Sequence, residues 1–124
     1  MLAEAGLIAF VPTTDLDRAK KFYAGTLGLT LRSVNQFACV FDANGTMLRV
    51  TAVSAVTPQP FTVLGWAVPD IYAAARDLAG AGIQLERFDG LDQDETGVWT
   101  APDGDLVAWF HDPDGNRLSI AQFG

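Results

Sequence analysis

The chain has 124 residues, of which 49% are apolar and 19% are charged, and its formal net charge is −7. This size and composition fit one globular domain with its own core and exclude a wholly disordered chain. The acidic balance argues against a nucleic-acid partner, and no apolar run approaches the roughly 18 residues that would span a bilayer. The first residues lack the basic flank and apolar run of a signal peptide, so we expect a cytoplasmic protein without a membrane partner.

The first half of the chain predicts one strand, one helix and three further strands. The first strand stops at Pro12, and Asp15 then offers an N-cap for a helix with apolar residues at helical spacing. Asn44-Gly45 predicts a hairpin turn, because both positions tolerate positive φ. Apolar runs bounded by turn residues predict strands at residues 7–11, 29–34, 37–42 and 46–53.

The same order restarts after the proline-containing stretch 57–60. Asp70 predicts the N-cap of a second helix that ends at Gly80-Ala81-Gly82, and Asp114-Gly115 predicts a last hairpin. Strands are predicted at residues 61–68, 83–88, 97–100, 106–110 and 117–122.

The two halves therefore form an internal repeat. Asp15 and Asp70 are 55 residues apart, whereas Gly45 and Gly115 are 70 residues apart, so we expect extra residues in the second half at the polar stretch 89–96. The sequence predicts an α+β fold with two βαβββ modules, at about residues 1–56 and 61–124, within a single domain. We expect the modules to form a curved mixed, mostly antiparallel sheet around a cleft.

The chemistry of several common sites is excluded by composition. His111 is the only histidine and Cys39 the only cysteine. An iron site of two histidines and one carboxylate, a zinc site with two or three histidines, and an internal disulfide are therefore excluded. Imidazole titrates near neutrality, so His111 is a candidate catalytic base. Cys39 is predicted to be a small buried hydrophobe.

The motifs of the whole chain resemble those of the vicinal oxygen chelate superfamily, which includes glyoxalase I, extradiol dioxygenases, fosfomycin-resistance proteins and bleomycin-binding proteins. The resemblance is carried by DLDRAKKFY at 15–23, LGL at 27–29, WAVPDI at 66–71 and FHDPDGN at 110–116. It implies the repeated fold, but it does not specify an activity, because this scaffold hosts many chemistries.

The resemblance also implies where a metal would be bound. The family's ligand positions correspond to Ile8, Arg49, Val63 and Ser119, where relatives hold His, Gln or Glu. Two of these side chains are hydrocarbon, one is a cation, and a serine hydroxyl alone is a poor ligand. We therefore expect no metal and no cofactor.

Strand alternation predicts which side chains face the cleft. Phe10 shares a face with Ile8, and Arg117 shares one with Ser119. By resemblance to fosfomycin-resistance proteins, Trp109 lines the pocket, and Trp99 on the neighbouring strand joins it. The alternative is that both tryptophans are core residues with the indole N–H bonded to the backbone.

Two other side chains leave alternatives open. Trp66 is expected on the helix side of its sheet, in the core. Arg49, on an apolar strand, is expected to meet an anionic ligand group, and the alternative is an ion pair or an exposed sheet edge.

The leading hypothesis is a metal-free protein that binds a small aromatic or cationic molecule, similar to bleomycin-resistance proteins, and that forms a homodimer. The alternatives are a glyoxalase-like lyase or isomerase working without the usual metal ligands, and an accessory or regulatory partner domain. The candidate ligand-binding residues are Phe10, Arg49, Val63, Trp99, Trp109 and Ser119.

Overall fold

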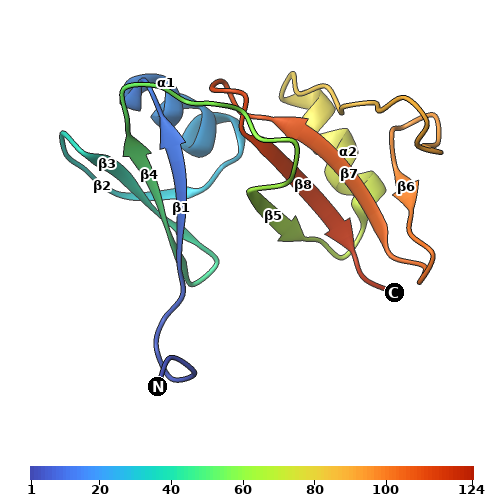
Figure 1. Cartoon of the computed structure of the whole chain (residues 1–124), viewed down its shortest axis with the longest axis horizontal. Coiled ribbons are helices and arrows are strands. Elements are labelled where there is room, and N and C mark those ends of the chain that lie inside the picture. Colours follow the sequence, from blue (N-terminus) through green and yellow to red (C-terminus); the bar gives the residue numbers. More distant parts are fainter. The chain divides into compact units, whose positions relative to one another are not determined.

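The computed structural model describes all residues from Met1 to Gly124. The chain divides into two compact units. The first module contains Met1–Thr57 and Pro113–Gly115, and the second module contains Pro58–Asp112 and Asn116–Gly124 (Figure 1). No helix has the length and hydropathy needed to cross a bilayer. The single domain expected from the sequence stays a prediction, which the presence of one or two unfolding transitions would test.

The first module has the predicted order of one strand, one helical segment and three strands. Its sheet has the strand order β1-β4-β3-β2, with β1 parallel to β4 and the other pairs antiparallel. The elements are β1 (Ile8–Thr13), α1 (Leu16–Lys20), the π-helical η1 (Lys21–Thr26), β2 (Thr30–Val34), β3 (Ala38–Ala43) and β4 (Thr46–Ala52).

Two details of this module differ from the sequence prediction. The strand β1 continues through Pro12 to Thr13 instead of stopping, which is possible because β1 lies at the edge of its sheet. The predicted helix begins at the Asp15 cap but widens into a π-turn, where the backbone N–H of Leu27 donates to the carbonyl of Phe22. The π-helical segment contains Tyr23, whose side chain is buried.

The first predicted hairpin is confirmed. Asn44 and Gly45 have φ values of 51° and 90°, which few residue types adopt without strain. The carboxylate of Asp42 accepts a hydrogen bond of 2.8 Å from the backbone N–H of Gly45, which fixes the turn.

The second module repeats this architecture. Its sheet has the order β5-β8-β7-β6, again with one parallel pair, β5 and β8. The predicted α+β fold with two βαβββ modules is therefore confirmed, with the strands hydrogen-bonded as two four-stranded sheets rather than one continuous sheet. The elements are β5 (Leu64–Ala67), α2 (Ile71–Gly80), β6 (Trp99–Thr100), β7 (Leu106–His111) and β8 (Arg117–Gln122).

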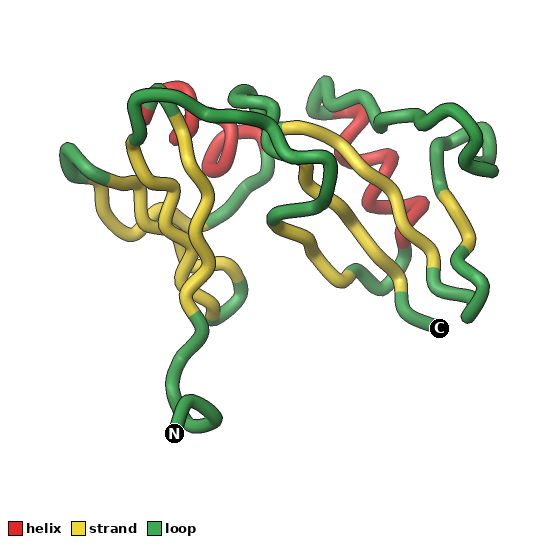
Figure 2. Tube along the Cα trace, in the orientation of Figure 1, coloured by secondary structure: helices red, strands yellow, loops and turns green.

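The strand predicted at residues 83–88 is wrong. The whole segment between α2 and β6 is drawn as loop in Figure 2. The amide of Gln93 explains this, because its oxygen accepts from the Phe88 N–H and its nitrogen donates to the Glu86 carbonyl. A side chain thus bonds backbone groups that a strand ladder would have used. One backbone bond joins this segment to the sheet, from the N–H of Glu86 to the carbonyl of Trp109 on β7.

Helix α2 covers one face of the second sheet. The Asp70 carboxylate caps it by accepting from the N–H groups of Tyr72 and Ala73, as predicted. Trp66 stacks on the buried Phe110, with ring centroids 6.3 Å apart and planes at 22°. Trp66 therefore lies on the side of the sheet that carries the core, as expected. Its module core comprises Ile71, Ala75, Val98, Ala108, Phe110, Leu118 and Ile120.

Candidate functional site

The second sheet has a face that points away from its core, and the strand register determines which residues share it. Trp109 on β7 pairs with Ser119 on β8, and Val107 pairs with Trp99 on β6. Directly paired residues project to the same side of a sheet. Arg117, which pairs with His111, joins this face two residues before Ser119. We call it the tryptophan face.

Three aromatic rings gather on the tryptophan face. The ring centroids of Trp99 and Trp109 are 6.1 Å apart, and Phe88 meets Trp109 edge to face at 5.3 Å and 85°. Such edge-to-face pairs contribute about 0.5–1.5 kcal/mol beyond their burial. Both tryptophans are half-buried, so neither indole is a fully enclosed core residue.

A charged group lies beside these rings. The guanidinium carbon of Arg117 lies 4.8 Å from the centroid of the Phe88 ring. The Nε and Nη2 atoms of Arg117 donate to the two carboxylate oxygens of Glu86 at 3.2 and 3.0 Å. The Nε2 atom of His111 lies 3.3 Å from the same carboxylate. The two parallel hydrogen bonds between Arg117 and Glu86 hold the guanidinium plane in place, and they leave Nη1 of Arg117 as a further donor.

A cavity of about 210 Å³ is lined by two of these rings, Phe88 and Trp109, and by the arginine. No acidic side chain lines it, so Arg117 provides its only charge. A cavity of this size holds one small ring system, since whole sites for drug-sized ligands occupy roughly 300–1,000 Å³. Its lining residues are Pro60, Phe61, Thr62, Phe88, Leu91, Trp109 and Arg117.

The loop that supplies Glu86 and Phe88 is fixed by polar contacts of its own. The Asp94 carboxylate accepts from the N–H groups of Thr96, Gly97 and Val98 and from the Tyr72 hydroxyl. Burial raises the pKa of Asp94, but these hydrogen bonds outweigh burial and hold the pKa below its ordinary value. These polar contacts fix the loop beside β6.

The two family metal positions in this module do not form a metal site. Val63 is hydrocarbon, and its N–H donates to the carbonyl of Arg117. Ser119 is buried opposite Gly65, so close that a Cβ added to Gly65 would lie 2.7 Å from the serine Oγ. The hydroxyl therefore occupies the space over the glycine. The structure contains no group of three His, Cys, Asp or Glu side chains that could hold a metal ion.

The other two family positions, with Phe10, lie in the first module. Phe10 on β1 pairs with Arg49 on β4, and both lie on the same face as Ile8. Phe10 is 61% exposed and Arg49 is half-buried. Arg49 makes no salt bridge, and β4 is an inner strand. Neither alternative for Arg49, an ion pair or an edge position, therefore applies. Ile8 and Arg49 offer no lone pair to a cation and do not fit a metal.

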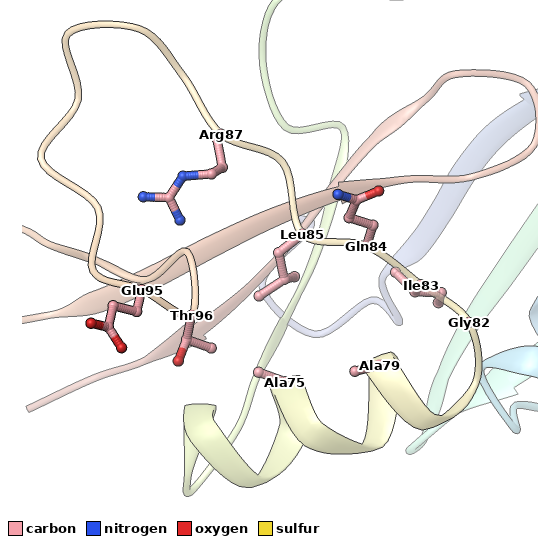
Figure 3. A pocket seen from close by; sticks show the side chains of 9 residues that line it. All are labelled: Ala75, Ala79, Gly82, Ile83, Gln84, Leu85, Arg87, Glu95 and Thr96. Atoms are coloured by element: carbon pink, nitrogen blue, oxygen red, sulfur yellow. The ribbon is translucent and has the colours of Figure 1, made fainter.

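A larger hollow of about 480 Å³ lies elsewhere in the second module, between α2 and the following loop. Figure 3 shows Ala75 and Ala79 on the helix side of this hollow, with Leu85 and Arg87 opposite. No aromatic residue lines it, and the Arg87 guanidinium already donates to the carbonyls of Gln93 and Asp94. The hollow therefore offers a ligand neither an aromatic surface nor an unengaged guanidinium, and the tryptophan face is the stronger candidate for a ligand-binding site.

Part of this site is predictable from the sequence, and part of it is not. The structure brings together Trp99 and Trp109, with Ser119 as the register partner of Trp109. Phe88 and Glu86 carry no such signal, because the apolar pattern of their segment predicts a strand that does not form. For Arg117 a signal existed, since alternation placed it on the face of Ser119.

The chain is similar to one described protein family. A sequence model of the Glyoxalase/Bleomycin resistance protein/Dioxygenase superfamily matches residues 6–120. No curated protein matches the sequence.

Many solved structures share the fold. An antibiotic-binding protein, TnmS3, from Streptomyces sp. CB03234 is 24% identical, with a TM-score of 0.74 over 100% of this chain and 99% of its own. A superfamily member from Sphaerobacter thermophilus is 21% identical, with a TM-score of 0.76 over 99% and 100%. A lactoylglutathione lyase from Agrobacterium tumefaciens is 18% identical, with a TM-score of 0.75 over 96% and 93%. At these identities the likeness establishes the fold alone.

Proposed function

This chain belongs to the Glyoxalase/Bleomycin resistance protein/Dioxygenase superfamily, and from that premise we propose that it binds a small planar aromatic molecule on the tryptophan face. The observation that carries the proposal is the cavity beside Trp109, with the Phe88 ring and the Arg117 guanidinium also in its wall. A flat ring stacked on the half-buried indole gains aromatic contact without having to open the core. The antibiotic-binding neighbour from Streptomyces is in keeping with this proposal.

We propose binding without catalysis and without a metal. The residues at the family's metal positions cannot supply a ligand set, and His111 is paired with Glu86 rather than with a nucleophile. The alternative of a glyoxalase-like lyase or isomerase predicts that a bound compound is converted. Recovering the compound from the protein after prolonged incubation distinguishes the two, because a binding protein returns it unchanged.

The test is a thermal-shift screen with one- and two-ring planar aromatic compounds, followed by titration of those that stabilise the protein. A ligand at 100 times its Kd adds about 2.7 kcal/mol to the free energy of unfolding. Trp109→Ala should lower the affinity for such a compound at least tenfold, about 1.4 kcal/mol. The matched control is Trp66→Phe, on the opposite face of the same sheet, which should leave the affinity unchanged. Equal losses in both variants would contradict the proposed site.

A further inference from the structure

The tryptophan face also determines what kind of planar ligand it accepts. We propose that the site selects planar aromatic molecules with an oxygen acceptor at the ring edge, a carboxylate or a carbonyl, which Arg117 binds through Nη1. This inference rests on the proposed function, and it names the ligand class of the same site.

Arg117 already uses part of its hydrogen-bonding capacity within the protein. Two of its three nitrogen atoms donate to Glu86 at 3.2 and 3.0 Å, and the guanidinium lies over Phe88. The side chain of Arg117 is 18% exposed, so it is held in one place and still reaches the surface. Because the structure has no buried polar side-chain atom without a partner, the remaining Nη1 donor is open to solvent or ligand.

The second step is the position of this donor relative to the rings. Arg117 and Trp109 both line the cavity of about 210 Å³. In the proposed binding pose a ring stacks on Trp109 and turns its edge toward the arginine. A hydrogen bond to a charged partner is worth about 1.5–3 kcal/mol when it forms, which is enough to rank ligands.

The third step concerns the charge of the ligand. The sequence left an aromatic or a cationic ligand open, and the structure favours an acceptor over a cation. The Glu86 carboxylate, which contacts the lining residue Arg117, is already paired with this arginine and lies close to His111. A cation in the cavity would meet the positive guanidinium without any acidic residue in the lining to offset it.

The experiment compares four ligands that share one ring system and differ in one group. The probes are 2-naphthoate, 2-acetonaphthone, naphthalene and (2-naphthylmethyl)ammonium, each titrated into the unaltered protein and followed by NMR shifts. We expect 2-naphthoate and 2-acetonaphthone to bind more tightly than naphthalene, and 2-naphthoate to bind at least tenfold more tightly than the ammonium compound. An ammonium affinity equal to or above that of 2-naphthoate would overturn the inference.

Variants then assign the effect to one residue. Arg117→Leu should lower the affinity for 2-naphthoate at least tenfold and that for naphthalene less than about twofold. Arg76→Leu, which removes an exposed arginine on α2, should change neither. If Arg117→Leu does not fold, Arg117→Lys serves instead, because lysine keeps the charge but cannot reach Glu86 and the ligand with one planar fork. Parallel losses for both probes would show a structural role and overturn the inference.

The outcomes separate this inference from the proposed function. If naphthalene binds in a manner that depends on Trp109 while 2-naphthoate binds no better, the proposed function stands and the acceptor selectivity is wrong. If none of the four probes binds up to its solubility limit, the proposed function fails and the selectivity fails with it.

Discussion

The hydroxyl of Thr13 donates a hydrogen bond of 2.6 Å to the carboxylate of Asp114, a residue 101 positions further along the chain. The same carboxylate accepts from the N–H and hydroxyl of Thr14 at 3.0 and 2.9 Å and from the guanidinium of Arg18 at 2.7 Å. The Asp114 side chain is 3% exposed. Because this buried carboxylate accepts hydrogen bonds from several donors, we expect it to raise the free energy of unfolding.

Asp114→Asn should lower the free energy of unfolding at pH 7 by about 1.5–3 kcal/mol, because the charged acceptor is lost while the shape is kept. Burial raises the pKa of Asp114, but the hydrogen bonds from Thr13 and Thr14 and the charge of Arg18 outweigh burial and lower the pKa. Because the pKa of Asp114 is lower in the folded state than in the unfolded state, where it is about 3.9, the ionised carboxylate stabilises the fold at pH values above about 3.9. This stabilisation is lost as the pH falls through the folded-state pKa.

The difference in the free energy of unfolding between the unaltered protein and Asp114→Asn should therefore be constant from pH 7 to about pH 5 and shrink at lower pH. Urea denaturation at each pH measures this difference. Asp89→Asn, at an exposed position, is the control and should change stability little. A difference that persists unchanged to pH 2 would show that the carboxylate charge is not responsible.

Trp66 and Trp109 offer a second comparison, between the two faces of one sheet. Trp66→Ala should destabilise the protein by about 3 kcal/mol, because it leaves a cavity against Phe110. Trp109→Ala should cost less, because the indole already borders an open cavity. Chemical denaturation of both variants measures the two costs, and the reverse order would mean that Trp109 and not Trp66 supports the core.

The metal prediction follows from donor chemistry. Ile8 and Val63 offer no lone pair, and the positive charge of Arg49 repels a cation at short range. Elemental analysis of protein purified without chelators should find no stoichiometric divalent ion. About one zinc, nickel, manganese or iron ion per chain, lost in Ser119→Ala, would contradict it.

The thiol of Cys39 should be unreactive in the folded protein. Its side chain is buried and its sulfur donates to the Leu16 carbonyl at 3.6 Å. Burial raises the pKa of the Cys39 thiol, so the reactive thiolate is scarce at neutral pH. A thiol reagent should label the folded protein at least about a hundredfold more slowly than the urea-unfolded protein, and equal rates would refute the burial.

The homodimer remains a prediction, supported by the frequency of symmetric dimers among oligomers and by exposed apolar side chains on β1 and β4. Ile8, Phe10 and Met47 are 47%, 61% and 43% exposed. Light scattering should give twice the chain mass of 13.3 kDa. The single-chain mass at all micromolar concentrations would contradict the dimer, and Phe10→Asp should produce that mass if this face is the interface.

The sequence by itself determined the elements whose signals are local. The helix caps at Asp15 and Asp70 and the hairpin at Asn44-Gly45 depend on residues a few positions apart, and all three are present. The two-residue period of a strand likewise put Arg117 on the same face as Ser119, whereas the pocket position of Trp109 came from the family resemblance and remains a prediction.

Only the tertiary structure decided the rest of the candidate site. Residues 83–88 have the apolar pattern of a strand, yet the Gln93 amide bonds the backbone of Glu86 and Phe88 and prevents the ladder from forming. Phe88 thereby meets Trp109, and Glu86 meets Arg117, a residue 31 positions away. The outcome depended on a competition between one side chain and a neighbouring strand for the same hydrogen bonds, and no local pattern encodes which of the two prevails.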